Sequence, residues 1–382
     1  MEEIKKIGFL MNPYAGIGGR AGLKGSDNLE KVKELLHHGY EKTAEKRAEI
    51  CMRQIENLSG YRLFSASGEM GENLLNRLGL PCEVIPCNTV TTREDTCKCA
   101  GRMNELGVEF LVFCGGDGTA RDICKAVDSQ IPVLGIPAGV KMYSACYAKN
   151  PFQAGELLAG WLSGKKMSCE LREVLDIEES DLDSRSVSPR LYGFLNVPND
   201  GIHIQKAKEV YTGAGEEAEC VAQAAVGRMK KDWIYIIGPG GTTWKIKELL
   251  CKKLEEQNPQ KEIIHGTVRG VDVVKNGEII IRDAGEKELW ELTRKYEQIK
   301  IMVTCIGGNG FLFGRGNQQI SPRMIRKIGK EQIEIIATKE KLAGLGGEPM
   351  HVDTGDVDTD QYLKGYYKII FHDTESAVYK IE

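Results

Sequence analysis

VEFLVFCGGDGTARDICKAV, residues 108–127, contains the turn that decides the fold of this chain. An uninterrupted apolar run at 108–114 passes directly into GGDGT at 115–119, and a helix-type pattern begins at Ala120. Strand, glycine loop and helix in this order are typical of a parallel sheet with helices on both faces. The glycines indicate a ligand that approaches the main chain closely, and phosphate is the common ligand of such a loop.

Phosphate binding alone does not explain Asp117, because a carboxylate repels a phosphate. A carboxylate can stand beside a bound phosphate in two situations. A divalent cation can lie between the two groups, or the carboxylate can take a proton from a reacting hydroxyl. Phosphoryl transfer to an alcohol requires both charge neutralisation and a carboxylate near the attacking hydroxyl. The structural alternative is that Asp117 caps the helix that follows it.

Short apolar runs and helical patterns alternate through the first 165 residues. We predict strands at 4–12, 61–67, 82–87, 108–114 and 132–137, and helices at 29–37, 42–58, 70–78, 91–106 and from 120 onward. The alternation predicts a Rossmann-like, three-layer α/β domain over residues 1–165. From about residue 168 strand-like segments dominate, interrupted by helical patterns at 242–257 and 288–298, which predicts a β-rich, mostly antiparallel second domain over 166–382. Ligand pockets favour domain interfaces, so we expect the site in the cleft between the two domains.

Many of the 44 glycines gather in four loops. The loops are NPYAGIGG (12–19), GGDGT (115–119), GPGGTT (238–243) and GGNGFLFGRGN (307–317). Loops that follow strand-like runs face the ligand in an open parallel sheet, although each loop alone could be a tight turn that needs positive φ. None reads GxxxxGK[ST], which excludes a Walker-type site. No GxGxxG opens a helix after the first strand, which argues against a dinucleotide-dependent dehydrogenase.

The composition narrows the class of protein. With 51 basic and 55 acidic residues the formal net charge is −4, which argues against general binding to nucleic acid or an anionic membrane. The apolar runs fall far short of the ~20 residues of a membrane span, and the N-terminal one is too short for a signal peptide, so we expect a cytoplasmic protein. The 12 cysteines and six histidines show no clear metal-ligand spacing, and we expect reduced thiols and no permanently bound metal.

The stretches NPYAGIGG, FCGGDGTARD and IIGPGGTT together resemble the superfamily of NAD kinases and diacylglycerol- and sphingosine-type lipid kinases. That superfamily carries GGDGT in a Rossmann-like first domain, followed by a β-rich second domain. LGIPAGVKMYSA, VTCIGGNGFLFGRGNQQISP and HVDTGD are similar to the prokaryotic ATP-NAD kinase family, in the branch related to a protein of acetoin-catabolism operons. The resemblance runs from Ile7 to about Gly365.

The resemblance implies an ATP-dependent kinase that phosphorylates the 2′-hydroxyl of NAD to give NADP, with Mg²⁺ accompanying ATP. Asp117 would be the catalytic carboxylate. The nucleotide- and phosphate-binding residues would be Asn12, Gly16, Gly115, Gly116, Gly118, Thr119, Gly240, Gly241, Thr242 and Thr243. Weaker candidates are Gly139, Asn199, Asp200, Asp272, Gly308 and Arg315. Some family members accept polyphosphate in place of ATP, and we expect a homo-oligomer.

The identity of the acceptor stays open. Pro137 and Ala138 stand where NAD kinases usually have an asparagine, and Asn199–Asp200 is the nearest match to the Asn–Glu pair that holds NAD. A kinase of another small alcohol, such as a polyol or ketol, or of a lipid is therefore the first alternative, and the composition argues against the lipid. The second is a nucleotide-binding regulator without turnover, which would have no need of the Asp117 carboxylate.

Overall fold

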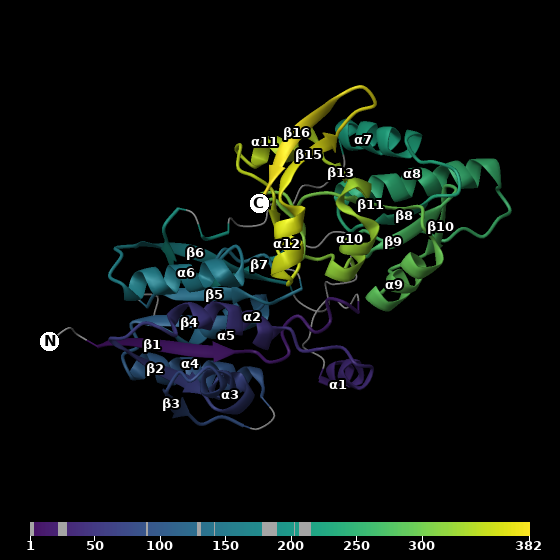
Figure 1. Cartoon of the computed structure of the whole chain (residues 1–382). Helices are drawn as coiled ribbons and strands as arrows, with labels where there is room; N and C mark the ends of the chain where they lie inside the picture. The colour runs from purple at the N-terminus through teal and green to yellow at the C-terminus, as the bar shows by residue number, and fades with distance from the viewer. Residues whose placement is uncertain are drawn as a thin grey trace. The chain divides into compact units, whose positions relative to one another are not determined.

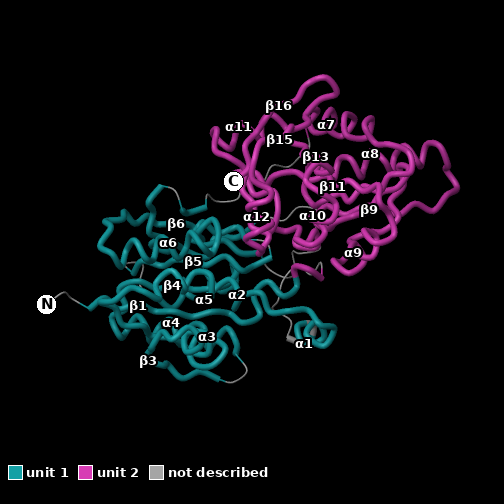
Figure 2. Tube along the Cα trace, viewed as in Figure 1, with its two compact units in different colours: residues 1–18, 24–207 teal, residues 19–23, 208–382 magenta. Residues whose placement is uncertain are grey.

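The computed structural model describes residues 4–21, 29–88, 91–127, 131–140, 142–177, 189–201, 203–205 and 215–382. The chain divides into two compact units (Figure 2). Unit 1 comprises Met1–Gly18 and Lys24–Ala207, and unit 2 comprises Gly19–Leu23 and Lys208–Glu382. The segment between the predicted domain boundary at 165 and residue 207 is therefore part of unit 1.

Unit 1 is built on a five-stranded parallel sheet in the order β3-β2-β1-β4-β5 (Figure 1). The strands are β1 (Lys5–Met11), β2 (Tyr61–Ala66), β3 (Cys82–Ile85), β4 (Phe110–Gly115) and β5 (Val133–Pro137). Every residue of β4 is buried, as expected for a central strand that is covered on both faces. The chain runs outward from β1 to β3 and then continues on the other side of β1, so the carboxyl ends of β1 and β4 form the switch point of the sheet.

Helices cover this sheet, and the predicted Rossmann-like α/β architecture is confirmed. They are α1 (Leu29–His37), α2 (Ala44–Met52), α3 (Glu72–Arg77), α4 (Arg93–Glu105), α5 (Asp117–Ala126) and α6 (Pro151–Leu162), with 3-10 turns at Arg53–Ile55 and Gly68–Met70. The sequence prediction missed α6. Its start signals are Asn150, which accepts the Gln153 N–H at 2.8 Å, and Pro151 in the first helical turn.

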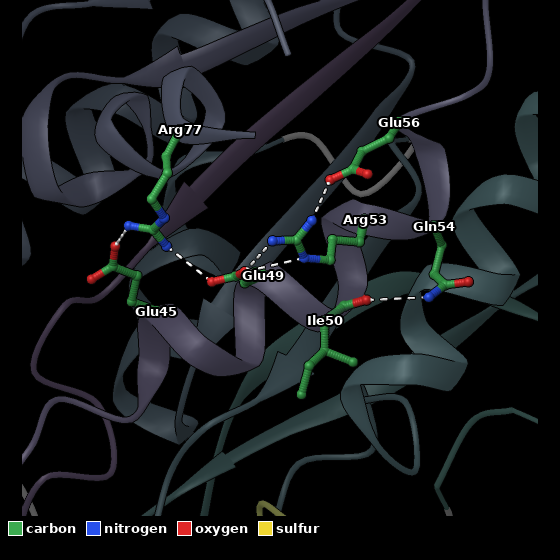
Figure 3. A network of polar contacts seen from close by, with 7 residues as sticks. All are labelled: Glu45, Glu49, Ile50, Arg53, Gln54, Glu56 and Arg77. Atoms are coloured by element: carbon green, nitrogen blue, oxygen red, sulfur yellow. Dashed lines mark hydrogen bonds and ion pairs between the residues drawn. The ribbon is translucent and has the colours of Figure 1, made fainter. Parts of the chain in front are cut away.

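An ion-pair network on α2 joins it to α3 (Figure 3). Arg77 of α3 pairs with Glu45 and Glu49 of α2, and Arg53 pairs with Glu49 at 2.6 Å and with Glu56 at 3.0 Å. The hydrogen bond from Arg53 has the largest effect on the pKa of Glu49 and lowers it. The hydrogen bond from Arg77 lowers it further, so the pKa stays below its usual range although burial raises it. Because these side chains are partly exposed, each pair contributes only about 0–1 kcal/mol to stability.

A long antiparallel hairpin completes unit 1. It consists of β6 (Ser168–Asp176) and β7 (Arg190–Asn199), and both strands contact α5. Arg121 of α5 lies 2.6 Å from the Asp176 carboxylate at the end of β6, an ion pair that is mostly buried. These contacts explain why the hairpin belongs to the first compact unit.

Unit 2 contains a seven-stranded sheet in the order β10-β9-β8-β11-β13-β15-β16, which confirms the strand-rich second unit. The strands are β8 (Ile234–Ile237), β9 (Asp272–Lys275), β10 (Glu278–Ile281), β11 (Ile299–Val303), β13 (Ile333–Ile336), β15 (Gly365–Ile370) and β16 (Ser376–Ile381). The expected antiparallel pairing occurs at the two margins, whereas β8, β11, β13 and β15 are parallel. The central strands are Ile- and Val-rich runs buried on both faces, the form that parallel strands take.

Helices cover both faces of this second sheet. They are α7 (Glu216–Gly227), α8 (Gly241–Gln257), α9 (Glu286–Lys295), α10 (Pro322–Ile328), α11 (Lys339–Gly344) and α12 (Val357–Leu363). Along β8, Ile234 and Ile236 share a core with α9, α10 and α12, whereas Tyr235 and Ile237 share one with α7 and α8. A separate parallel pair is formed by β12 (Phe311–Phe313) and β14 (His351–Val352).

Candidate active site

The loops after β1 and β4 lie next to each other at the switch point of the unit 1 sheet. The two strands pair in register up to Met11 opposite Cys114, and the Asn12 N–H then donates to the Cys114 carbonyl at 2.9 Å. The Asn12 side-chain amide donates to Thr119 Oγ1 at 3.4 Å and accepts the Tyr14 N–H at 3.0 Å. Asn12 and Thr119, which come from two different loops, are thus brought together by the sheet.

Several of the predicted glycines stand where main-chain segments touch. A Cβ on Gly16, whose φ is +79°, would lie 2.3 Å from the Ala138 carbonyl oxygen, and a Cβ on Gly139 would lie 2.8 Å from Gly116 Cα. The N–H groups of Ala138 and Gly139 both donate to the Gly115 carbonyl, at 2.9 and 3.2 Å. The loops after β1, β4 and β5 therefore form one backbone-lined surface, of the kind that binds phosphate.

Asp117 is the first residue of α5, and Gly118 and Thr119 follow it in the first turn. Its carboxylate, only 5% exposed, accepts the main-chain N–H of Tyr143 at 2.6 Å and of Ser144 at 3.1 Å. These bonds reach a different segment of the chain, so Asp117 does not cap its own helix. Burial raises the pKa of Asp117 to about 7, and the hydrogen bonds from Ser144 and Tyr143 offset only part of that effect.

The segment that binds the Asp117 carboxylate is itself held by a buried serine. Ser144 Oγ donates to the Leu175 carbonyl at 2.9 Å and accepts the Leu175 N–H at 3.0 Å, and Gln205 Nε2 donates to the Ser144 carbonyl at 3.0 Å. The sequence prediction missed Tyr143 and Ser144, although both stand in LGIPAGVKMYSA, one of the stretches that carry the family resemblance. That stretch was the signal that could have identified them.

Helix α2 places a guanidinium at the same edge of the sheet. The Arg47 Nε–H donates to the Pro137 carbonyl at the end of β5. Thr43, just before α2, donates through Oγ1 to the Ala15 carbonyl at 3.3 Å. The Arg47 side chain thus lies against the end of β5, where the loop that contains Ala138 and Gly139 begins. The sequence prediction missed it because EKTAEKRAE reads as a solvated helix face.

In unit 2 the loop after β8 opens α8. Gly240 caps the helix with φ of +128° and donates its N–H to the Val268 carbonyl at 2.8 Å. Gly241 and Thr242 begin the helix, and Thr243 Oγ1 donates to the Gly240 carbonyl at 2.9 Å. The predicted residues of GPGGTT thus form a helix N-terminus at the carboxyl end of a parallel strand, where anions commonly bind.

A buried lysine contacts this helix start. Lys341 of α11 donates from Nζ to Thr242 Oγ1 at 3.0 Å and to Thr304 Oγ1 at 3.1 Å. These residues follow β13, β8 and β11, so their side chains meet at the carboxyl edge of the parallel centre of the sheet. The sequence prediction missed Lys341, which stands 99 residues from Thr242 in IEIIATKEKL, a stretch that reads as a strand-like segment.

Asp272, a weaker candidate, lies in a fully buried ion pair. Its carboxylate is 2.7 Å from Lys247 Nζ of α8 and accepts the Thr267 N–H at 2.7 Å. Lys247 Nζ also donates to the Thr267 carbonyl at 2.9 Å, one residue before the carbonyl that accepts the Gly240 N–H. The Asp272–Lys247 pair thus holds Thr267 in place, and the next residue, Val268, accepts the hydrogen bond from the GPGG loop.

Arg315 and Gly308 lie in the glycine-rich segment after β11. Arg315 lies 2.7 Å from the Asp353 carboxylate in a buried pair, and its guanidinium lies 4.6 Å from the centroid of the Phe311 ring. Gly308 takes φ of +79° in a turn. The ion pair joins GGNGFLFGRGN to HVDTGD, two of the stretches that carry the family resemblance.

Asn199 and Asp200 lie at the end of the hairpin strand β7. Asn199 Nδ2 donates to the Glu170 carboxylate of β6 at 2.8 Å. The Asp200 carboxylate lies 2.6 Å from His203 Nδ1 and 3.2 Å from Lys165 Nζ. These contacts stay within the turn and its neighbours, and none of them joins the glycine loops.

Within the described ranges, no group of three or more His, Cys, Asp or Glu side chains gathers as metal ligands. The 12 cysteines are all free thiols. Each helix in the described part of the chain is too short or too polar to traverse a lipid bilayer.

Two solved structures show a distant similarity to the chain. One, "A putative diacylglycerol kinase from Bacillus anthracis str. Sterne", is 13% identical over 47% of this chain and 47% of that chain, with a TM-score of 0.25. The other, a crystal structure of a putative diacylglycerol kinase from the same organism, is 11% identical over 62% of this chain and 59% of that chain, with a TM-score of 0.25. The chain thus spans about half the length of these structures. No curated protein matches it.

Two family domains match the sequence directly. Residues 7–165 match the ATP-NAD kinase N-terminal domain, and residues 234–381 match the ATP-NAD kinase C-terminal domain. The first match contains the loops around Asp117, and the second contains GPGGTT and Lys341. Together they cover most of the chain, which therefore belongs to the ATP-NAD kinase family, a family of phosphotransferases that act on an alcohol.

Proposed function

We propose that the protein is an ATP-dependent kinase that transfers a phosphoryl group to the 2′-hydroxyl of NAD. Membership of the ATP-NAD kinase family supports the donor and the class of reaction. One observation carries the proposed mechanism: Asp117 is a buried carboxyl group with a pKa of about 7, and it opens the helix beside the backbone-lined glycine loops. A carboxylate whose pKa lies near the working pH is well matched to general base catalysis.

In the proposed reaction the Asp117 carboxylate takes the proton of the acceptor hydroxyl. The hydroxyl oxygen forms a bond to the γ-phosphorus of ATP while the bond from that phosphorus to the bridging oxygen of ADP breaks. The N–H groups of Tyr143 and Ser144 hold the carboxylate oxygens in place. Each oxygen has two lone pairs, so one on each remains to accept the proton.

The phosphates of ATP would lie against the main chain around Gly16, Gly115, Gly116 and Gly139, with the N-terminus of α5 directed at them. Mg²⁺ often keeps several waters and binds through substrate phosphates, so the ion that accompanies ATP would be held mainly by the phosphate oxygens and by water. When bound with ATP, Mg²⁺ neutralises charge on the phosphates. In unit 2, considered by itself, the start of α8 and Lys341 would bind an anionic group of a nucleotide.

A second acceptor, a small alcohol such as a polyol or ketol, has one observation in its favour. Asn199 and Asp200 were expected to replace the pair that holds NAD, but their side chains contact Glu170, His203 and Lys165. The identity of the acceptor therefore rests on family membership rather than on these two residues. A cytoplasmic location follows from the proposal, because ATP and NAD both occur there.

Incubation of the purified protein with Mg-ATP and NAD tests the proposal, with NADP detected by a coupled dehydrogenase. NADP formation that depends on both substrates is the expected result. ATP consumption with a polyol or ketol and none with NAD would establish the second acceptor class. Binding of ATP without turnover of any acceptor would identify a nucleotide-binding regulator instead. Replacement of ATP by polyphosphate in the same assay identifies the donor.

A further inference from the structure

Unit 2 contains a cavity of about 410 Å³, broadly open to solvent, at the end of β8 opposite the GPGG loop. It lies between the C-terminal end of α7, the start of β8, helix α8 and the β9–β10 turn at Asn276–Gly277. Ile234 pairs with Lys275, which places this turn beside the amino end of β8. The volume falls in the range of small-molecule sites, roughly 300–1,000 Å³.

The inner wall of the cavity is apolar. Tyr235 and Leu250 are 1% and 4% exposed, and Val226 and Met229 are half-buried beside them. The Tyr235 hydroxyl accepts the Lys230 N–H at 2.8 Å, which fixes the position of the ring. A short hydrocarbon or aromatic group that entered the cavity would therefore leave water for contacts with aliphatic and aromatic side chains.

The rim of the cavity is positively charged. Lys230 and Lys231 both line it and are both exposed. The Lys230 ammonium lies 5.0 Å from the centroid of the Trp233 ring. The neighbouring carboxylate, Asp232, accepts a hydrogen bond from Asn276 Nδ2 at 3.2 Å. Across the described ranges, neither rim lysine forms an ion pair with a carboxylate, so both charges are available to an anion.

We propose that this cavity binds a small amphipathic carboxylate, with its apolar part against Leu250 and Val226 and its carboxylate between Lys230 and Lys231. The apolar wall favours the hydrocarbon part of such a molecule, and the cationic rim attracts its carboxylate. This site lies at the opposite end of β8 from the loop assigned to the nucleotide, and it does not depend on the proposed kinase reaction.

Isothermal titration of the 382-residue chain with hexanoate tests the proposal. Acetate and 1-hexanol serve as probes that carry only the charge or only the apolar part. Hexanoate should bind saturably, and each of the other two should bind about tenfold more weakly or worse. High salt should weaken the binding of hexanoate, because the rim charges are exposed and are screened.

Two double variants with the same charge change separate the rim from the rest of the surface. Lys230→Met with Lys231→Met should weaken hexanoate binding about tenfold, because the cationic rim is lost. Lys252→Met with Lys253→Met, at exposed positions of α8 that do not line the cavity, should leave it unchanged. Val226→Trp, checked for folding by circular dichroism, should fill the cavity and abolish binding. No saturable binding of hexanoate, equal binding of 1-hexanol, or equal losses in the two double variants would overturn the proposal.

Discussion

The Tyr143 N–H lies 2.6 Å from the Asp117 carboxylate, although the two residues stand 26 positions apart. Asp117 opens the helix after β4, and Tyr143 follows β5, so the contact joins the carboxyl ends of two neighbouring parallel strands. Its donor is main chain, and the acceptor is a carboxyl group with a pKa raised by burial to about 7. The fold thus holds a buried carboxylate in a fixed orientation and keeps it basic at neutral pH.

The raised pKa of Asp117 should make the protein less stable as the pH rises from about 4 to about 7. Between its ordinary pKa of 3.8 and its folded value of about 7, the carboxyl group is protonated in the folded chain and ionised in the unfolded one. Unfolding then releases a proton, so a rising pH favours unfolding, and the effect levels off above about pH 7. The loss over this window is on the order of a few kcal/mol at most.

Denaturant unfolding of the wild type and of Asp117→Asn across this window checks the prediction. The difference in unfolding free energy, variant minus wild type, should increase with pH, because asparagine does not titrate. Asp373→Asn, the same substitution at an exposed position, serves as the control. A difference for Asp117→Asn that stays constant with pH would contradict a raised pKa at this site.

Gly16→Ala should destabilise the protein more than Gly39→Ala does. Both glycines have φ of +79°, so both variants carry the same backbone strain, about 1–2 kcal/mol. At Gly39 a Cβ meets nothing within 4 Å, whereas at Gly16 it would lie 2.3 Å from a main-chain oxygen. The clash should add about 1–3 kcal/mol and weaken ATP binding. Equal unfolding free energies for the two variants would show that the loops do not touch as described.

Lys341→Met should raise the KM for ATP about tenfold while kcat changes less, if Lys341 binds the nucleotide without contacting the reacting atoms. Lys341 is 6% exposed and donates to Thr242 and Thr304 at the start of α8. Lys339→Met is the matched control on the same helix, because Lys339 is exposed and pairs with Glu375 at 2.6 Å. An unchanged KM, or a loss confined to kcat, would argue against a nucleotide-binding role.

Asp272→Ala should destabilise unit 2 by about 3–5 kcal/mol, because it leaves the Lys247 ammonium buried without its carboxylate. Glu278→Ala breaks an ion pair of the same 2.7 Å length, with Lys261, but at an exposed position, where the loss should stay below about 1 kcal/mol. Unfolding in urea measures both. Similar losses in the two variants would mean that burial does not determine the contribution of the Lys247–Asp272 pair.

Much of unit 1 could be predicted from the sequence because its strands are local signals. The run that becomes β4 is apolar throughout and ends at GGDGT, so the burial of the strand and a helix close behind it follow from adjacent residues, although α5 begins at Asp117 rather than at Ala120. The partners of Asp117 could not be predicted in this way. Tyr143 and Ser144 contact Asp117 because β4 and β5 are neighbours in the sheet. A local sequence pattern does not determine the order of strands in a sheet.

The same limit applies to unit 2. The strands β8, β11 and β13 are short Ile-rich runs that fit either direction of pairing, and their parallel arrangement depends on the helices that connect them. Lys341 reaches Thr242 and Thr304 because of that arrangement. Helix α7 was also not predicted, because EEAECVAQAAVG contains many small residues and shows no strong apolar stripe.

The rate of NADP formation by Asp117→Asn, compared with wild type at equal ATP occupancy, tests the catalytic role of Asp117 most directly. The substitution keeps the shape of the side chain and removes the base, so kcat should fall by about 10²–10⁴-fold while ATP still produces a thermal shift. A kcat within a few-fold of the wild type would contradict the assignment of Asp117 as the group that accepts the proton of the reacting hydroxyl.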